Sequence, residues 1–316
     1  TICMQYQSET KVENISWQKA KVYTDFVNRI ANQENDLEQW VGGYLNANNL
    51  KDKTKNRKQV NRQILVSTLT EYYKKQSALT SVKEGLINNL LADNCYTVTS
   101  GHQICFLTGP LYFVVKIAQS IRLAEQFKTW QPESDFVPIY WMATEDHDYE
   151  EIRKAHIFNQ DFQIDESNAH EAVGKRSVSL MKEVLERELE PLLNKNENGS
   201  KAWGIIHQSF LNSKTLSDFC FHLTNTLFAD YPLLILDANQ KAFKESFQPV
   251  LEQELENNTV FNTVTKTNED LKYLSIPAIN PRDLNLFYCN EEKRQRLTKL
   301  NGEIQSAETK QVFSKE

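Results

Sequence analysis

Apolar residues recur every three or four positions over much of residues 1–94, a spacing typical of helices that bury one face. The pattern is clearest over residues 15–31, 62–76 and 81–91. In the last of these, Ser81 precedes Glu84 by three positions, which predicts a capping box at the start of the helix. No cluster of ionisable residues there indicates chemistry. We therefore expect a helical N-terminal region over residues 1–94.

The pattern changes to that of a strand at Cys95. Residues 95–100 (CYTVTS) are rich in β-branched and aromatic residues, and we expect Gly101 to end this strand. Gly109-Pro110 then predicts the first turn of a helix, where proline is favoured. The apolar residues that follow fall on one helical face: Phe113, Val114, Ile117, Ala118, Ile121 and Ala124.

Two further strands are predicted before the middle of the chain. Residues 135–143 (DFVPIYWMA) form the second, although Pro138 argues against full pairing at its centre. Residues 153–158 (RKAHIF) indicate a third. A strand, a helix and a strand at this spacing form a βαβ unit, and such units build parallel sheets.

The same theme returns in the second half of the chain. Helical patterns over residues 216–231 and 239–257 enclose a buried strand at 232–238 (PLLILDA). Residues 160–215 between the two halves are polar and irregular, which favours an inserted connecting segment. The expected fold class is α/β, with a discontinuous core at 95–159 and 216–290.

Composition narrows the classes of partner and location. A chain of 316 residues corresponds to one large domain or two ordinary ones. The net charge of −6, with no dense Lys/Arg cluster, argues against nucleic acid as a partner. Five scattered cysteines without a CxxC pair fit reduced thiols. No signal peptide and no apolar run of about 20 residues is found, so we expect a cytoplasmic protein without membrane contact.

Candidate chemistry gathers where the predicted strands end. In open parallel sheets the ligand lies beyond the carboxyl ends of the strands. Three places meet that condition, and we expect them to face one crevice: residues 100–103 (SGHQ), residues 145–148 (EDHD) and Asp237.

The first place offers two possible anion cradles. Gly101 lets the backbone approach a ligand, and Thr108-Gly109 precedes a helix whose free N–H groups favour negative charge. The fragment TSGH is similar to the T-x-G-H turn of nucleotidyltransferases, where the histidine steadies phosphates; here it is His102. No Gly-Lys-Ser/Thr follows, so a Walker A loop is excluded. The alternative is that Gly101 and Gly109 form ordinary turns.

The second place concentrates four ionisable groups at a strand end. A carboxylate beside a histidine can orient and charge it for acid–base work, which makes Asp146, His147 and Asp148 candidate catalysts. At most two neighbouring side chains of an extended chain converge. No HExxH or paired-cysteine pattern supplies further ligands, so we predict no metal site. The alternative is a solvated acidic turn with a capping aspartate.

Basic residues elsewhere could bind an acidic ligand. Lys175 and Arg176 in VGKRS are suited to this, but the segment also fits a hairpin turn. Arg282 follows Pro281 and suits a carboxylate, or a structural salt bridge. Cys105 has no visible charge partner, so we do not expect a reactive thiol.

Five phrases, in this order and spacing, resemble the family of bacillithiol biosynthesis cysteine-adding enzymes. The likeness covers residue 60 to the end and rests on SGHQICFLTGPLYFVVKI, VPIYWMATEDHDYEEI, AVGKRSVSL, FADYPLLILDAN and NPRDLNLFY. The resemblance implies a Rossmann-like core at the boundaries above, with an inserted connecting segment. It also implies a C-terminal coiled-coil region that forms a homodimer. We expect only the start of that region, at 291–316, so that the chain is a fragment.

The resemblance also implies an activity, the joining of L-cysteine to glucosaminyl malate in the last step of bacillithiol synthesis. Activating the cysteine carboxylate points to ATP as a cofactor, with Mg²⁺ only as its companion. In this scheme Gly101, Gln103, Thr108 and Gly109 cradle an anion, and Lys116 or Arg282 binds the malyl carboxylates. Glu145 and Asp237 complete the binding site.

Two features keep alternatives open. Many members of the family have glutamine at the position of His102, which weakens a scheme that makes His102 the catalyst. An adenylyl-transferring enzyme on the same fold would release pyrophosphate without consuming cysteine. A non-catalytic coiled-coil assembly protein would depend on no small molecule.

Overall fold

A computed structural model describes residues 13–57, 60–164, 172–272, 279–290 and 294–313. Its centre is a parallel sheet of three strands in the order β1-β2-β5. The strands are β1 (Cys95–Gln103), β2 (Asp135–Ala143) and β5 (Leu234–Asp237). The α/β class and the parallel, Rossmann-like core are therefore confirmed. The pairing of β5 with β2 begins at Ile139, directly after Pro138, as expected for a proline in this strand.

The helix α6 (Tyr112–Trp130) crosses from β1 to β2 and covers one face of the sheet. The Phe113 ring packs edge-on against Tyr140 of β2, 5.2 Å between centroids, and against His102 of β1 at 5.6 Å. Even-numbered residues of both strands thus face α6, and odd-numbered residues face the other side. Of the predicted helix face, only Ala118 is exposed.

Two predicted boundaries near this helix are wrong. Gly101 does not end β1, which continues to Gln103 because its backbone stays paired with β2. The helix begins at Tyr112, because Leu107 and Thr108 adopt left-handed backbone angles and a short turn precedes Pro110.

The N-terminal region is helical, as predicted. Its helices are α1 (Trp17–Ala20), α2 (Asp25–Ala31), α3 (Ala47–Lys55), α4 (Arg62–Lys75) and α5 (Ser81–Asn89). The single helix expected over residues 15–31 is instead broken, with Lys21 in a left-handed conformation. The predicted capping box is also wrong, because the Thr80 side chain, not Ser81, accepts from the Lys83 N–H at 3.2 Å.

Helices α4 and α5 join the same core as the sheet. The backbone N–H of Ile235 donates to the Tyr73 hydroxyl at 2.8 Å, which occupies an outer backbone group of the edge strand β5. The buried Lys83 ammonium donates to the Leu233 carbonyl at 2.7 Å. Side chains from α4, α5, α6 and the sheet form one cluster of buried residues.

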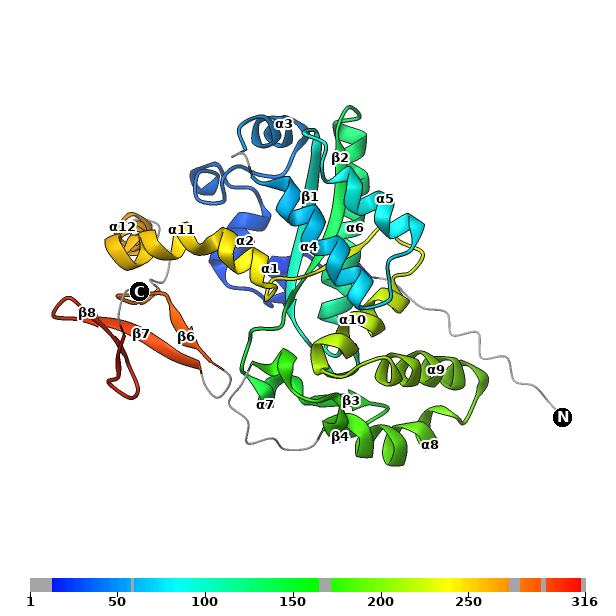
Figure 1. Ribbon diagram of the computed structural model, residues 1–316. Coiled ribbons are helices and arrows are strands. Elements are labelled where there is room, and N and C mark those ends of the chain that lie inside the picture. The colour runs from blue at the N-terminus through cyan, green and yellow to red at the C-terminus, as the bar shows by residue number, and fades with distance from the viewer. Residues whose placement is uncertain (1–12, 58–59, 165–171, 273–278, 291–293, 314–316) are drawn as a thin grey trace.

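The segment after β2 lies at the carboxyl ends of the strands (Figure 1). It holds α7 (Tyr149–Ile152) and an antiparallel hairpin of β3 (Lys154–Ile157) and β4 (Gln160–Gln163). The predicted third strand therefore exists, but it pairs within this hairpin and not in the parallel sheet.

Residues 172–215 are not irregular, contrary to the expectation. They form the 3-10 turns η3 (Val173–Lys175) and η4 (Val178–Met181), the π-helical η5 (Val184–Leu189), α8 (Glu190–Leu193) and α9 (Glu197–Leu211). The few apolar residues recur at helical spacing and enter the core, among them Met181, Leu185 and Leu189. Helix α10 (Leu216–Leu227) then leads back to β5.

The last part of the chain adds a separate sheet of four short strands beside α11 (Lys241–Asn257) and α12 (Thr259–Lys272), which we call the smaller sheet (Figure 1). Its antiparallel strands are β6 (Phe287–Cys289), β7 (Arg294–Leu300), β8 (Glu303–Ser306) and β9 (Val312–Phe313). The Asp283 carboxylate accepts from the Thr298 hydroxyl and from the Lys299 N–H, which fastens β7 to the preceding loop. Among the helices in the described ranges, none is both long and apolar enough to cross a membrane. The predicted domain boundaries at 94, 159, 215 and 290 stay predictions.

Candidate functional site

The predicted places at the three strand ends are joined by hydrogen bonds. Gln103, the last residue of β1, donates from its amide to the Asp146 carboxylate in the turn after β2. The Thr144 hydroxyl donates to the Asp237 carboxylate at 2.6 Å, which links the ends of β2 and β5. The structure therefore brings Gln103, Asp146 and Asp237 to one edge of the sheet, where parallel α/β folds place their ligands.

Asp237 is buried, and both of its carboxylate oxygens are hydrogen-bonded within the protein. Besides Thr144, it accepts from the Asn239 N–H at 3.0 Å and the Gln240 side chain at 2.9 Å. Through these bonds it shapes the turn between β5 and α11 and positions Asn239 at the sheet edge.

The segment VGKRS lies directly against the end of β2. The Gly174 N–H donates to the Thr144 carbonyl at 3.0 Å, and the Val173 N–H donates to the Asp146 carbonyl at 2.6 Å. A Cβ atom on Gly174 would lie only 2.6 Å from the Cβ of Thr144, so this approach requires glycine. The contact places Lys175, the next residue, beside Glu145.

A pocket of about 290 Å³ opens at this edge, between the core and the smaller sheet. Three cationic side chains line it together with one carboxylate, and we call it the basic pocket. Its charged lining residues are Glu145, Lys175, Lys244 and Arg294, and Asn239 and Cys289 also contribute. Three cations in one pocket favour an anionic ligand.

The sequence prediction found two of these residues and missed others. Glu145 was expected in the site, and Lys175 was weighed as a ligand for an acidic group. Lys244 on α11 and Arg294 on β7 carry no local motif, because the fold brings them from distant parts of the chain. Asn239 could have been found, since it follows the predicted strand that ends in Asp237.

Asp146 is held as a carboxylate by its surroundings. Partial burial alone would raise its pKa. Hydrogen bonds from the Gln103 side chain and from the N–H groups of His147 and Asp148 outweigh burial, so the pKa of Asp146 lies below its ordinary value. A carboxylate stabilised in this way is a weak base, and it suits a positioning role.

His147 lies between Asp146 and the smaller sheet. Its Nδ1 contacts Nη1 of Arg294 and is 3.4 Å from Oδ1 of Asp146. A guanidinium can only donate, so in this contact Nδ1 accepts, and a neutral imidazole then carries its proton on Nε2. Arg294 itself is held over the Phe287 ring, 3.7 Å from guanidinium carbon to centroid. His147 is thus arranged to donate a hydrogen bond through Nε2.

Asp148 is exposed and caps the short helix α7. Its Oδ1 accepts from the Glu151 N–H at 3.3 Å. The capping aspartate weighed at the sequence level is therefore present, at this position. Capping occupies one oxygen only, so the second oxygen can accept a proton.

The other predicted residues lie on the opposite side of β1 or further away. Lys116 of α6 donates to the Gly101 carbonyl at 2.5 Å, and its ammonium lies 5.1 Å from the Tyr112 ring centre. Thr108 and Gly109 belong to the turn before α6 and do not line the basic pocket. His102 packs against α6, with Nδ1 3.4 Å from the Cys105 sulfur. Whether these four bind ligand stays a prediction.

Arg282 and Arg176, which the sequence suggested as ligands for an acidic group, have different surroundings in the structure. Arg282 is exposed on the connection before β6 and is not among the residues that line the basic pocket. Arg176 is buried, with its guanidinium 4.0 Å from the Tyr149 ring centre. The segment around it forms a 3-10 turn and not a hairpin.

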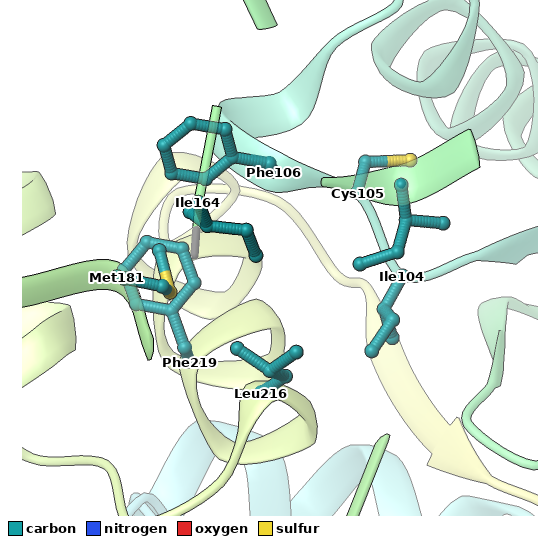
Figure 2. Close-up of a pocket in the computed structure, with 8 residues that line it drawn as sticks. Ile104, Cys105, Phe106, Ile164, Met181, Leu216 and Phe219 are labelled. Atoms are coloured by element: carbon teal, nitrogen blue, oxygen red, sulfur yellow. The ribbon is translucent and has the colours of Figure 1, made fainter. Parts of the chain in front are cut away.

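Cys105 faces the apolar interior and not the basic pocket. Burial raises the pKa of its thiol to about 12. The cavity next to it, shown in Figure 2, has a volume of only about 10 Å³ and is lined by apolar residues such as Ile104, Phe106 and Leu216. A cavity this small barely holds one water molecule. It is a packing defect rather than a ligand site.

Sequence comparison identifies the family. Residues 10–316 match the N-terminal Rossmann-like domain of bacillithiol biosynthesis BshC. The chain belongs to the BshC family. It is 33% identical over 308 residues to the "Putative cysteine ligase BshC" of Flavobacterium johnsoniae, 31% over 311 residues to that of Christiangramia forsetii and 30% over 296 residues to that of Cytophaga hutchinsonii.

The match covers most of this chain but not of its relatives. It includes 96% of the chain for the first two BshC proteins and 92% for the third. The chain spans 57%, 57% and 54% of those relatives' own lengths. In BshC terms, the sheet edge and basic pocket described above lie in the N-terminal domain.

Proposed function

We propose that this chain carries the acceptor-binding and proton-transfer part of a ligase that joins L-cysteine to glucosaminyl malate in bacillithiol biosynthesis. One observation carries the proposal: a pocket with three cations adjoins the turn that holds the exposed carboxylate of Asp148, at the carboxyl edge of the sheet. The names of the relatives support the reaction class, since they are described as cysteine ligases.

The basic pocket fits the two carboxylates of a malyl group. Lys175, Lys244 and Arg294 supply the positive charge, and Arg294 can bind a carboxylate through the guanidinium N–H groups that do not contact His147. Lys116 is already engaged with the Gly101 carbonyl, and Arg282 lies outside the pocket lining. The proposal therefore assigns the malyl carboxylates to the pocket cations instead of these two residues.

Glu145 gives the pocket a single negative charge among the cations. An acceptor that carries an amine as well as two carboxylates matches this combination of charges. The amine would approach Glu145 and the neighbouring turn of Asp146, His147 and Asp148, which we call the acid–base turn. The carboxylates would lie on the cations. Asn239 and Asn290 add neutral groups that can bond to sugar hydroxyls.

The reaction requires an activated cysteine carboxylate, for which we propose ATP, accompanied by Mg²⁺. An oxygen of the cysteine carboxylate attacks ATP and takes either its phosphoryl group, with release of ADP, or its adenylyl group, with release of pyrophosphate. The acceptor nitrogen attacks the carboxyl carbon, so that the C–N bond forms and the bond to that oxygen breaks. The activating group leaves with the oxygen. The attacking amine releases one proton, and Asp148 accepts it.

The three residues of the acid–base turn then have separate roles. Asp146 is fixed by Gln103 and holds the turn in place. His147 donates from Nε2 toward the oxygen that becomes negative as the amine attacks. Gly101 and Gln103 remain candidates for binding ATP, whereas Thr108 and Gly109, in the turn before α6, do not line the basic pocket and receive no role here.

Replacing Asp148 tests the proposal in the full-length protein. Asp148→Asn keeps the helix cap, because asparagine caps as well as aspartate, but cannot take the proton. We expect the rate of amide formation to fall by about 100-fold or more, while the thermal midpoint stays that of the wild type. Asp161→Asn, at a carboxylate with 91% side-chain exposure on the β3–β4 hairpin, is the matched control.

Two results would contradict the proposal. Wild-type amide formation by Asp148→Asn would remove the assigned base. Pyrophosphate release from ATP without consumption of cysteine would favour the adenylyl-transferring alternative. A homodimer built by the remaining part of the protein, and a cytoplasmic location, stay predictions.

A further inference from the structure

Among the residues that the structure describes, nothing covers one face of the sheet next to the site. Odd-numbered residues of β1 and β2 point away from α6, and at the amino end of β2 they are buried, as in Val137 and Ile139. Toward the carboxyl end this cover is lost, and the Trp141 side chain is 44% exposed. The open area has a volume of about 470 Å³ and includes Thr99, Gly101 and Gln103. We call it the indole shelf.

Gly101 leaves the flank of the indole uncovered. It is the direct neighbour of Trp141 in the register of β1 and β2. A Cβ atom at residue 101 would lie 3.9 Å from the nearest atom of Trp141, an ordinary contact distance. A side chain would therefore fit, and would cover the shelf. Glycine keeps the ring surface accessible to a flat group.

Hydrogen bonds link the indole shelf to the basic pocket at the carboxyl edge of the sheet. Gln103 lines the shelf, and its amide bonds to the Asp146 carboxylate. The Asp146 carbonyl in turn accepts from the Val173 N–H, two residues before Lys175 of the pocket. Along the chain, Trp141 and Glu145 are four residues apart, and the chain turns at Thr144, so their backbones lie within about 13 Å of each other. A nucleoside triphosphate can reach across such a distance.

We propose that the indole shelf binds the purine ring of a nucleoside triphosphate whose phosphates extend toward the cations of the basic pocket. The ring stacks on Trp141, and the Thr99 hydroxyl lies at its edge. The inference rests on the proposed function, which uses ATP, and adds the place of its base. The phosphates and the acceptor carboxylates then share one cationic region, which brings the two reacting groups together.

The composition of the shelf favours a flat ring over another protein segment. A packed helix or strand would need several exposed apolar neighbours, whereas Trp141 is flanked by Gly101 on β1 and by the buried Leu236 on β5. A single aromatic platform beside a cationic pocket matches the two ends of a nucleotide, one flat and one anionic.

Binding of ATP and of tripolyphosphate to the full-length protein tests this inference. Isothermal titration on the wild type, Trp141→Ala and Trp141→Phe separates the contribution of the base from that of the phosphates. We expect Trp141→Ala to lower the affinity for ATP by about 5- to 100-fold, the range that base–aromatic stacking contributes. Tripolyphosphate should bind as before, and Trp141→Phe should retain most of the ATP affinity. Phe158→Ala, at a side chain 73% exposed on the hairpin, is the control.

Several outcomes would overturn the assignment. The first is an unchanged ATP affinity in Trp141→Ala. The second is an equal loss of affinity for ATP and for tripolyphosphate in that variant. The third is no ATP binding by the wild type. The proposed function is judged separately, by amide formation in the wild type and in Asp148→Asn. A protein that forms the amide in an Asp148-dependent way but ignores Trp141 would retain the ligase assignment and reject the indole shelf.

Discussion

Nη1 of Arg294, on the smaller sheet, contacts Nδ1 of His147, in the turn after β2. The contact joins two parts of the chain that are 147 residues apart. Because Nδ1 accepts in this contact, a neutral imidazole carries its proton on Nε2, so the smaller sheet controls the orientation of a candidate catalytic group.

Arg294→Gln should therefore affect both binding and chemistry. Loss of a cation from the pocket is expected to raise the KM for the acceptor by about tenfold, and loss of the contact with His147 to lower kcat. Arg294→Lys keeps the charge but not the fork-shaped geometry of the guanidinium. Its KM should therefore lie between those of Arg294→Gln and the wild type, while its kcat should stay close to that of Arg294→Gln. Steady-state kinetics on the full-length protein would measure both. Arg187→Gln is the control, because Arg187 of η5 forms an exposed ion pair with Glu183 away from the pocket. Equal kinetics for Arg294→Gln and this control would refute the role of Arg294 in binding and chemistry.

Gly174→Ala should destabilise the fold. The new methyl group would lie 2.6 Å from the Thr144 Cβ and 2.7 Å from its carbonyl oxygen, so the segment must move. A cost of about 1–3 kcal/mol is typical of such overpacking, and the displacement of Lys175 should weaken acceptor binding. Thermal unfolding measures the first effect.

Gly204→Ala provides the matched comparison within helix α9. No atom lies within 4 Å of the Cβ position there, and alanine favours a helix by up to about 1 kcal/mol over glycine. The two variants should thus shift the midpoint in opposite directions. A midpoint for Gly174→Ala at or above that of the wild type would show that the close approach is not needed.

Lowering the pH should reduce the contribution of Asp146 to the stability of the fold. Its pKa is lower in the folded protein than in the unfolded chain. Its contribution to stability is therefore complete above the unfolded value of about 3.9 and is lost as the pH falls through the lower folded value. Asp146→Asn should lose less stability than the wild type when the pH is lowered from 5 to 3. Unfolding midpoints across this range, with Asp52→Asn at an exposed carboxylate of α3 as control, would test the sign. Parallel curves for the wild type and Asp146→Asn would argue against it.

Thiol labelling should separate the described cysteines into two classes. Cys289 is exposed at the basic pocket, whereas Cys95, Cys105 and Cys220 are buried, and burial raises the pKa of each of these three thiols. With a pKa of about 12, the Cys105 thiol is almost wholly protonated at pH 8. Iodoacetamide should alkylate Cys289 first, and a ligand in the basic pocket should slow that reaction. Peptide mass spectrometry would read each site, and rapid labelling of Cys105 would contradict the buried placement.

The sequence predicted the core of the fold because its signals are local. Residues 135–143 and 232–238 are short apolar strands, and the helix behind Phe113 repeats at helical spacing, so these elements follow from their own residues. The hairpin partner of residues 154–157 could not be predicted in this way, because strand pairing depends on where the chain turns back. The break near Lys21 also lies in a segment with no glycine or proline.

The candidate site was predicted only in part, for a similar reason. Glu145, Asp146, His147 and Asp148 follow one strand and form a visible cluster. Lys244 and Arg294 are ordinary basic residues in the sequence and acquire meaning only from the position of α11 and β7. A pocket assembled from distant segments leaves no motif in any one of them.

The three pocket cations come from three separate parts of the chain: the segment after the hairpin, helix α11 and the smaller sheet. Without an anion they repel one another across the pocket. A bound dianion or polyphosphate would act as a clamp that draws the smaller sheet onto the core. Ligand binding should then slow hydrogen exchange in β6 and β7, which are far in sequence from the acid–base turn. The clamp should weaken as salt screens the charges.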